Sequence, residues 1–210
     1  MDRHENTANI FNKYASEYEA KYMDVSLYAQ TLDVLLNLIQ NGNAEVLEIG
    51  CGPGNLSKYL SEKQPGWNLT GIDIAEKMVA LAQKNNPKAD FQVLDARKID
   101  KINHKFDAVI AGFLLPYLSK EESEEFILKC SRTLKKGGLL YLSFMEGAYV
   151  NSGFVGSSQD NKEQLFTFYH DAQYLKSYLE VNGFEIVHSA EIHNENNKPG
   201  VGDRVLISKH

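Results

Sequence analysis

The stretch VLEIGCGPGN, which runs from Val46 to Asn55, constrains this chain more than any other part of its sequence. An aliphatic run with one acidic residue is followed by glycines at every second position, Gly50, Gly52 and Gly54. A glycine has no Cβ, so the backbone can adopt positive φ there and a ligand can lie directly against it. The pattern predicts a strand that ends in a tight loop, with a ligand held against the bare main chain.

The spacing of the glycines separates this loop from two phosphate-binding motifs. The dinucleotide motif GxGxxG, counted from Gly50, needs a glycine where the chain has Asn55; counted from Gly52, it needs one at Ser57. No Lys-Ser or Lys-Thr pair follows the loop, as a P-loop requires. The loop therefore favours a nucleoside-like ligand over a phosphate cradle.

Three acidic residues lie at the ends of predicted strands. Glu48 comes two positions before Gly50 and could hold a cationic group or be a solvated strand end. Asp73 ends LTGID, at the usual distance of the ribose-binding acid, and its two oxygens can accept from both ribose hydroxyls. Asp95 ends FQVLD. As the alternative, Asp73 caps the following helix and Asp95 accepts within a turn.

In their order, the motifs VLEIGCGPGN, LTGIDIAEKM, FQVLDA, FDAVIAGFLLPYL and LKKGGLLYLSF resemble the class I S-adenosylmethionine-dependent methyltransferases, from Glu45 to about Phe144. The resemblance implies S-adenosylmethionine as cofactor and S-adenosylhomocysteine as product. It would place Glu48 and the glycines at the methionine end, Asp73 at the ribose, and Asp95 with Ala96 at the adenine. The cofactor-binding residues that we predict are Tyr14, Tyr18, Glu48, Gly50, Cys51, Gly52, Gly54, Asp73, Ile74, Met78, Asp95, Ala96 and Phe113.

Strands and helices are predicted to alternate through the middle of the chain. Short apolar runs, each read as a strand, cover 46–49, 69–72, 91–94, 106–111 and 139–144. Apolar residues recur with helical period between them, and a Ser119/Glu122 capping box begins the last of these helices, which Gly137 and Gly138 end. The alternation predicts an α/β fold with a Rossmann-like doubly wound sheet, mostly parallel, and helices on both faces.

The C-terminal part breaks this alternation. Residues 184–192 and 201–208 read as strands, and the connection 193–200 is too short for a helical crossover, so the pair should be antiparallel. The resemblance implies the same hairpin, seven strands in all, and a last strand beside the fifth. An NAD(P)-dependent Rossmann oxidoreductase, the main alternative, more often continues with another crossover.

Length and charge limit the class of protein. A chain of 210 residues fits one α/β domain, which the resemblance divides into a helical cap (1–42), a cofactor-binding core (43–144) and an acceptor-side loop, helix and hairpin (145–210). A net charge of −6 without a basic stripe argues against nucleic acid as partner. No leader and no membrane-spanning run is recognised. We expect a cytoplasmic monomer or homodimer without membrane contact.

Other chemistries find little support in the residue pattern. Cys51 and Cys130 lie far apart, which predicts two free thiols in a reducing compartment. The histidines lack metal-ligand spacing, so no metal is expected. No GxSxG motif occurs, and the Gly-Ser-Ser at 156–158 falls in a segment predicted as a loop.

Two helices are predicted before the first strand, over 7–22 and 26–40. In the first, aromatic residues recur at three- and four-residue steps: Phe11, Tyr14, Tyr18 and Tyr22. Such a stripe is consistent with a helix packed on the domain. The resemblance favours a lid over the cofactor, in which Tyr14 and Tyr18 contact the positively charged sulfonium.

Two segments carry the candidate acceptor residues. In AGFLLPYLS the resemblance places the acceptor near Phe113, although that residue can equally pack within its loop, and Tyr117 follows where many family members have a histidine. The segment 146–170, rich in Gly, Ser and Asn, is predicted as a mobile loop or insertion that continues into a short strand. Tyr117, Tyr169 and His170 are the candidates for a catalytic base; a loop histidine can also be merely solvated.

The predicted reaction is in-line methyl transfer from S-adenosylmethionine to a nucleophilic O, N, S or C atom of a small-molecule acceptor. Because the sulfonium is already activated, alignment and water exclusion would be the main contribution of the protein. Two other classes stay open: the oxidoreductase named above, and a non-catalytic regulator that binds S-adenosylmethionine.

Overall fold

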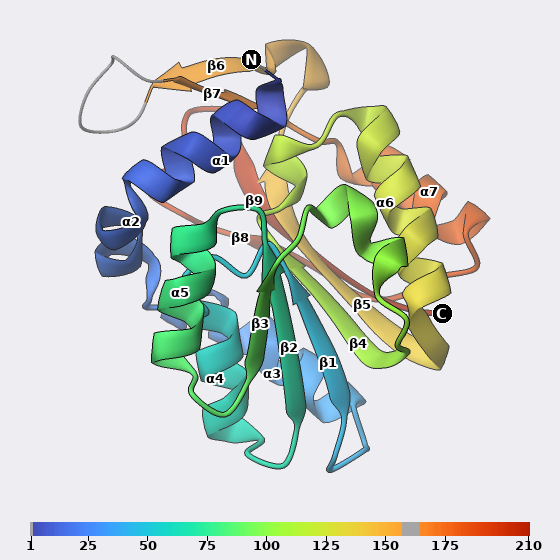
Figure 1. Cartoon of the computed structure of the whole chain (residues 1–210). Coiled ribbons are helices and arrows are strands. Elements are labelled where there is room, and N and C mark those ends of the chain that lie inside the picture. The colour runs from blue at the N-terminus through green and yellow to red at the C-terminus, as the bar shows by residue number, and fades with distance from the viewer. Residues whose placement is uncertain (1, 157–163) are drawn as a thin grey trace.

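The parallel strands of the protein meet in one central sheet. The computed structural model describes residues 2–156 and 164–210. Within them, seven strands are ordered β3-β2-β1-β4-β5-β9-β8, and a separate two-stranded sheet pairs β6 with β7 (Figure 1). The strands are β1 (Glu45–Ile49), β2 (Asn68–Asp73), β3 (Asp90–Val93), β4 (Phe106–Gly112), β5 (Leu134–Glu146), β6 (Gly153–Gly156), β7 (Gln164–Thr167), β8 (Glu185–Ile192) and β9 (Gly202–Lys209).

Helices connect the parallel strands and cover the sheet. The α-helices are α1 (Arg3–Lys13), α2 (Ala15–Tyr22), α3 (Ala29–Leu38), α4 (Asn55–Lys63), α5 (Glu76–Asn85), α6 (Lys120–Thr133) and α7 (Ala172–Val181). Short 3-10 turns are η1 (Ser26–Tyr28), η2 (Ala96–Lys101), η3 (Leu115–Tyr117) and η4 (Tyr149–Asn151). Within the described parts of the chain, every helix is too short or too polar to cross a lipid bilayer.

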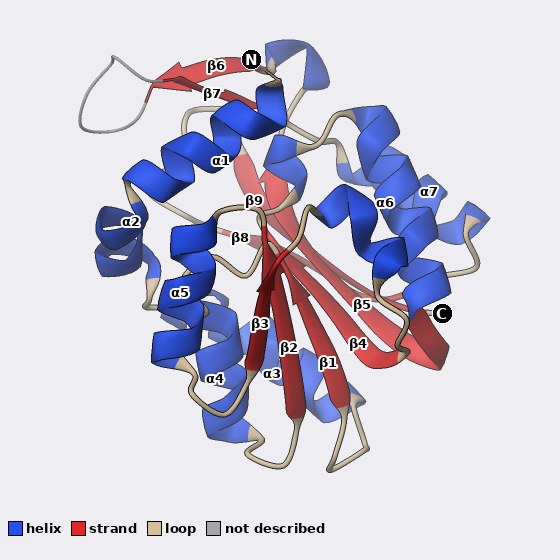
Figure 2. Ribbon diagram, viewed as in Figure 1, coloured by secondary structure: helices blue, strands red, loops and turns tan. Residues whose placement is uncertain are grey.

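The order of the strands reverses beside β1. This strand pairs in parallel with β2 on one side and with β4 on the other. Loops that leave β1 and β4 therefore diverge at the carboxyl edge of the sheet, where doubly wound folds form their ligand crevice (Figure 2). The glycine loop begins at this point, directly after β1.

The central strands β1, β4 and β5 are buried on both faces of the sheet, as the apolar runs in the sequence predict. Leu47 and Ile49 pack into the core that contains Phe126 of α6 and Leu175 of α7. Val46, which points to the opposite face, packs into the core beneath α3 and α4. Alternate residues of one short strand thus anchor helices on both sides, which confirms the predicted doubly wound fold.

The C-terminal hairpin has the predicted arrangement. β8 and β9 pair antiparallel, and β9 lies between β8 and β5. The capping box of α6 is also confirmed, because Ser119 accepts from the Glu122 backbone and Glu122 accepts from the Ser119 backbone. The helix ends before Leu134, earlier than the glycines at 137 and 138 suggested, because Leu134 already pairs with Phe106 of β4.

The N-terminal aromatic segment forms two helices where the sequence predicted one. Tyr14 leaves the helical conformation with φ −106° and ψ 25°, so α1 and α2 meet at an angle. On one straight helix, residues seven apart are separated by a rise of about 10 Å. The break instead brings the rings of Phe11 and Tyr18 into edge-to-face contact, with 5.5 Å between their centroids. We call α1 and α2 the lid, because they lie across the carboxyl ends of the strands (Figure 1).

The segment between β5 and α7 is more regular than predicted. It contains η4 and the β6/β7 hairpin, and β7 contacts α1 of the lid. Part of the predicted mobile loop, 157–163, including two residues of the Gly-Ser-Ser motif, lies outside the described residues.

Gly54 is required for the packing of α4 against α5. Its φ is +79°, and a Cβ built there would lie 2.4 Å from Nδ2 of Asn86 and 3.1 Å from Cβ of Ala82. The Asn86 amide donates to the Gly54 carbonyl at 3.0 Å and so joins the two helices. No side chain fits between them at this position.

We therefore expect Gly54→Ala to lower the free energy of unfolding by about 2 to 4 kcal/mol, through left-handed strain and overpacking. Urea denaturation at neutral pH measures the change. Gly42→Ala is the matched control, because nothing lies within 4 Å of its Cβ position; that variant should stay within about 0.5 kcal/mol. Equal stabilities of the two variants would contradict this account.

Candidate functional site

A cavity lies between the glycine loop and the lid. Gly50 and Gly52 line it with φ of 68° and 52°. A Cβ at Gly50 would lie 3.2 Å from Cδ1 of Leu114, and one at Gly52 would lie 3.7 Å from the Tyr18 ring. The loop therefore presents bare backbone to the cavity, as its sequence predicts.

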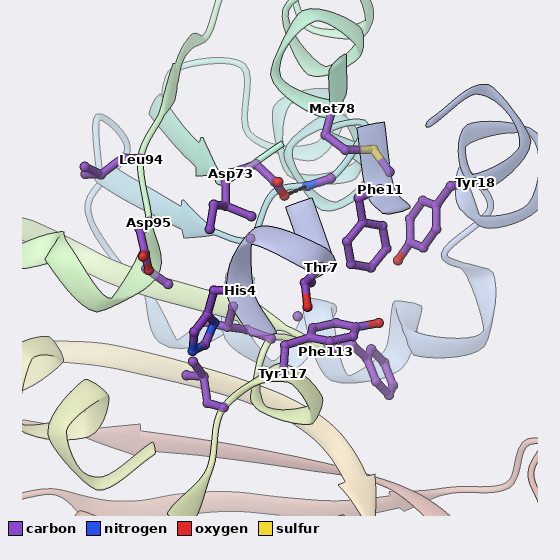
Figure 3. A pocket seen from close by; sticks show the side chains of 17 residues that line it. His4, Thr7, Phe11, Tyr18, Asp73, Met78, Leu94, Asp95, Phe113 and Tyr117 are labelled. Atoms are coloured by element: carbon purple, nitrogen blue, oxygen red, sulfur yellow. Dashed lines mark hydrogen bonds between the residues drawn. The ribbon is translucent and has the colours of Figure 1, made fainter. Parts of the chain in front are cut away.

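The structure brings many of the predicted site residues together on the cavity wall. They are Tyr18, Gly50, Gly52, Asp73, Ile74, Met78, Asp95, Ala96, Phe113 and Tyr117. Figure 3 shows the side chains of Asp73 and Asp95 on one side, and those of Phe11, Tyr18 and Tyr117 on the other. The wall thus joins the ends of β1, β2, β3 and β4 to the lid.

Asp73 holds the glycine loop in place. Its Oδ2 accepts from the Gly52 amide at 2.9 Å, and its Oδ1 accepts from the Ala75 amide at 2.8 Å. Burial raises the pKa of this carboxyl, although those backbone hydrogen bonds oppose the change. Each carboxylate oxygen has a second lone pair. The side chain can therefore support the loop and still accept from a ligand, and its predicted capping role is compatible with both.

Asp95 is paired with Arg97 at the edge of the cavity. The Arg97 guanidinium donates to Oδ2 at 2.6 Å, and the Arg97 amide donates to Oδ1 at 2.9 Å. Burial opposes ionisation, but the hydrogen bonds and charge of Arg97 more than offset it and hold the pKa of Asp95 below its usual value. The turn role that the sequence left open is thus present, on a residue that also lines the cavity.

Glu48 does not reach the cavity wall. It is 3% exposed, and its carboxylate accepts from the amide of Ser57 at 3.0 Å and from the Ser57 hydroxyl. Because side chains alternate along a strand, Glu48 points with Val46 to the α4 face. Burial raises the pKa of this carboxyl to about 7, although Ser57 opposes the shift. In this structure Glu48 therefore links β1 to α4 through Ser57.

Three other predicted cofactor residues lie outside the wall. Cys51 is 1% exposed, and burial raises the pKa of its thiol, so it remains protonated. Gly54 faces α5, as described above. Tyr14 ends α1, and the Lys13 ammonium lies 5.1 Å from the centre of its ring. The break in the lid turns Tyr14 away while it brings Phe11 and Tyr18 inward.

An aromatic roof closes the cavity on the lid side. The Phe11 ring meets Tyr117 edge to face with 5.2 Å between centroids, and it meets Tyr18 in the same way. Burial raises the pKa of the phenols of Tyr18 and Tyr117, so both stay protonated at neutral pH. They can donate hydrogen bonds but cannot act as bases from the ionised form.

Phe113 has an unusual backbone. Its φ is +52°, which is rare for a bulky residue without a structural cause. Ser143 holds this turn, because the Phe113 amide donates to the Ser143 carbonyl at 2.9 Å. The ring lies on the cavity wall and packs on Tyr28 at 5.3 Å between centroids. Strain of this kind is concentrated at functional sites.

Of the three candidate bases, the structure places Tyr117 alone on the cavity wall. Tyr169 is 4% exposed and His170 is fully buried. The His170 Nε2 lies 2.8 Å from the Leu115 carbonyl, and its Nδ1 contacts the Tyr174 hydroxyl. Burial lowers the pKa of His170, so its ring is neutral. His170 is therefore not a solvated loop histidine, which was the alternative to a catalytic role. Its ring holds η3 in place.

Sequence reasoning missed several residues of the wall: His4, Thr7, Phe11, Leu94, Gly112, Leu114 and Leu118. Phe11 belonged to the aromatic stripe, so its helical spacing was a usable signal. His4 precedes the predicted helix and Thr7 is its first residue, and neither carried such a signal. Their place on the wall depends on how the lid folds back over the sheet.

These features define a class of protein. A glycine loop after the first strand, a buried carboxylate at the end of the next, and a crevice at the strand-order reversal are typical of doubly wound proteins that bind nucleosides and nucleotides. Bare backbone at Gly50 and Gly52, together with the free lone pairs of Asp73, fits an adenosyl group.

Comparisons with known proteins narrow the class. Residues 46–138 match the family model described as "Methyltransferase domain". An uncharacterized methyltransferase of Anoxybacillus flavithermus is 27% identical over 180 residues, which cover 80% of this chain and 82% of that protein. The malonyl-[acyl-carrier protein] O-methyltransferase of Acetivibrio thermocellus is 30% identical over 135 residues, 63% of this chain but only 47% of that protein.

A solved structure has the same fold over the full length. Magnesium protoporphyrin IX methyltransferase from Synechocystis, with bound S-adenosylhomocysteine, has a TM-score of 0.77 at 21% identity and covers 100% of both chains. Together, these findings show a methyltransferase domain over residues 46–138, and a fold over the whole chain that is similar to that of an S-adenosylmethionine-dependent methyltransferase. The cofactor of the class is S-adenosylmethionine.

The buried carboxyl of Glu48 predicts a pH-dependent stability. Its pKa is about 7 in the folded chain and near 4.5 when exposed, so the folded state retains a proton that the unfolded state loses. Stability must then fall as pH rises from about 4.5 to 7. We expect the free energy of unfolding of Glu48→Gln to rise by about 2 to 3 kcal/mol relative to that of the parent chain as pH increases across this window.

Urea denaturation of both chains at pH 5, 6, 7 and 8 measures this difference. Glutamine keeps an oxygen for Ser57, so the comparison isolates the charge. A difference between the chains that is independent of pH would show that Glu48 is ionised at all of these pH values.

Proposed function

We propose that this protein transfers a methyl group from S-adenosylmethionine to a nucleophilic O, N, S or C atom of a small-molecule acceptor. One observation carries the proposal: the glycine loop and Asp73 face the aromatic residues of the lid across the same cavity. Bound there, S-adenosylmethionine supplies a methyl group on a positively charged sulfur. The protein would contribute binding, orientation and the exclusion of water.

Residues on the two sides of the cavity would divide this work. Gly50 and Gly52 offer backbone to the methionine end, Asp73 accepts from the ribose, and Asp95 borders the adenine. The rings of Phe11 and Tyr18 would attract the sulfonium by about 0.5 to 2 kcal/mol for each good contact. Cofactor roles for Tyr14, Glu48, Cys51 and Gly54 receive no support from their positions.

Alignment of the cofactor with the acceptor can supply most of the rate acceleration. Holding two reactants in a productive geometry is worth roughly 7 to 11 kcal/mol. The lid, with its closed aromatic roof, would keep water from the reacting atoms. Tyr117, protonated and on the wall, can orient an acceptor by donating a hydrogen bond. His170 would act at a distance, because its ring and the Phe168 amide hold η3, to which Tyr117 belongs; the position of Tyr169 supports no such role.

The names of similar proteins and the charge of this chain support a small acceptor. A structural neighbour is named for magnesium protoporphyrin IX, a small molecule, whereas a curated relative is named for malonyl-[acyl-carrier protein], a small acyl group on a carrier protein. A net charge of −6 supports a small acceptor rather than nucleic acid. We also propose that the chain acts as one domain, with 1–42 as the cap and 43–144 as the cofactor side. Residues 145–210 would support the acceptor side indirectly, through η3.

The ribose role of Asp73 has a direct test. We expect Asp73→Asn to weaken the binding of S-adenosylhomocysteine by about 10- to 100-fold, because charged hydrogen bonds to the ribose are lost. Isothermal titration calorimetry measures the affinity, and thermal melting checks that the loop still folds. Asp90→Asn, on the exposed start of the adjacent β3, is the matched control.

Unchanged affinity in Asp73→Asn would remove the ribose assignment. The same calorimetric experiment with NADH separates the oxidoreductase class. NADH should neither bind nor raise the melting temperature. Binding of NADH without binding of S-adenosylhomocysteine would favour that class over a methyltransferase.

A transfer assay tests the acceptor. Incubation with methyl-labelled S-adenosylmethionine and cell extract should put label into the low-molecular-mass fraction, and Asp73→Asn should greatly reduce it. Label in protein or nucleic acid would contradict a small acceptor. A chain that binds the cofactor and labels no fraction would be the non-catalytic regulator.

A further inference from the structure

His4 lies on the cavity wall although it belongs to the first turn of the lid. The residue is 7% exposed, and its side chain lines the cavity on the same side as Asp95 (Figure 3). The lid therefore contributes a polar side chain to the end of the cavity that also contains the carboxyl end of β3. A histidine in this place needs a partner, because burial without one is costly.

Glu122 of α6 is that partner. The His4 Nε2 lies 2.6 Å from Oε1 of Glu122, while Oε2 accepts from the Ser119 amide at 2.8 Å and pairs with Arg3. Burial opposes ionisation of Glu122, but the Ser119 amide and His4 outweigh it and hold the pKa of Glu122 below its usual value. An ionised carboxylate can only accept, so the proton of His4 must be on Nε2.

The other ring nitrogen, Nδ1, has an acceptor lone pair in the neutral form of the ring that carries its proton on Nε2. The Arg3 guanidinium lies 3.1 Å from Nε2 and does not change the assignment, because the closer carboxylate requires the proton. Among the described residues, the hydrogen bonds of His4 are all made through Nε2. None of these hydrogen bonds uses Nδ1.

One cluster of charges holds both His4 and Asp95 at this end of the cavity. Arg97 binds Asp95 at 2.6 Å, and its Nη1 lies 3.8 Å from the same Oε1 of Glu122 that contacts His4. The lid, α6 and η2 are thus joined through Glu122. His4 and Asp95 both line the cavity.

We propose that His4 is a specificity-determining residue that reads the base of the cofactor: its Nδ1 accepts a hydrogen bond from the exocyclic amino group of adenine. The inference rests on the proposed function, which places the adenine beside Asp95. Hypoxanthine has a carbonyl oxygen at that position, and the oxygen would face the Nδ1 lone pair. Closing the lid would then be favoured only by the correct base.

The test compares S-adenosylhomocysteine with its 6-oxo analogue, S-inosylhomocysteine, by calorimetry on the full chain. The parent chain should bind the adenosyl compound more tightly. His4→Phe keeps an aromatic ring of similar size and removes both nitrogens. We expect it to reduce the preference, as the ratio of the two Kd values, by about 5- to 20-fold, the equivalent of one hydrogen bond and a removed repulsion.

Glu122→Gln provides a second variant that should fold. Glutamine also completes a capping box, so α6 keeps its N-terminus, while the carboxylate that orients His4 is lost. The preference should fall by about 2- to 5-fold. Glu125→Gln on the same helix is the control, because that side chain is 63% exposed and pairs with Lys129; its ratio should equal the parent value.

The outcomes separate the two proposals. A parent chain that binds neither compound would defeat the proposed function. A parent chain that binds S-adenosylhomocysteine, with a ratio unchanged in His4→Phe and in Glu122→Gln, would overturn the role of His4 alone. If His4→Phe does not melt cooperatively, Glu122→Gln against Glu125→Gln decides the question.

Discussion

The hydrogen bonds of one buried carboxylate, that of Asp73, organise the whole site. Its two oxygens accept from backbone amides of Gly52 and Ala75, at the ends of β1 and β2 respectively. A carboxylate with 9% exposure needs such partners, because an unpaired buried charge is strongly unfavourable. The glycine loop therefore cannot move independently of β2. The backbone surface that would meet the cofactor depends on this single side chain.

The two sides of the cavity have different physical origins. Its floor consists of loops that follow parallel strands, so short sequence segments are sufficient to build it. Its roof is a helical lid that has to be held by contacts across the chain. Arg3 and His4 meet Glu122, and Phe11 meets Tyr117. Charges at one end and aromatic rings at the other keep the lid closed. Access to the site therefore depends on these contacts, together with the hydrogen bond that the Asn55 side chain at the end of the glycine loop donates to the Tyr22 carbonyl of the lid at 2.9 Å.

Most of the fold could be predicted from local patterns, and so could the residues of the floor. Gly50, Gly52, Asp73 and Asp95 lie on the wall because strand ends and loop geometry are locally encoded. Glu48 shows the limit of such reasoning. Its position next to the loop suggested a ligand contact, but the pleat of β1 turns the side chain toward α4. Glu48 does lie beside the glycine loop, but its side chain points away from the cavity.

By itself, the sequence determined the alternating elements, the C-terminal antiparallel hairpin, the bare-backbone loop and the class of cofactor. These depend on periodicity, glycine conformation and motif order, all of which act over short distances. Only the tertiary structure decided that the lid breaks at Tyr14, that His170 is buried under η3, and that His4 reaches the cavity. Each of these depends on contacts between residues far apart in the chain, such as His4 with Glu122. No local pattern carries that information, because the partner is chosen by the packing of whole elements.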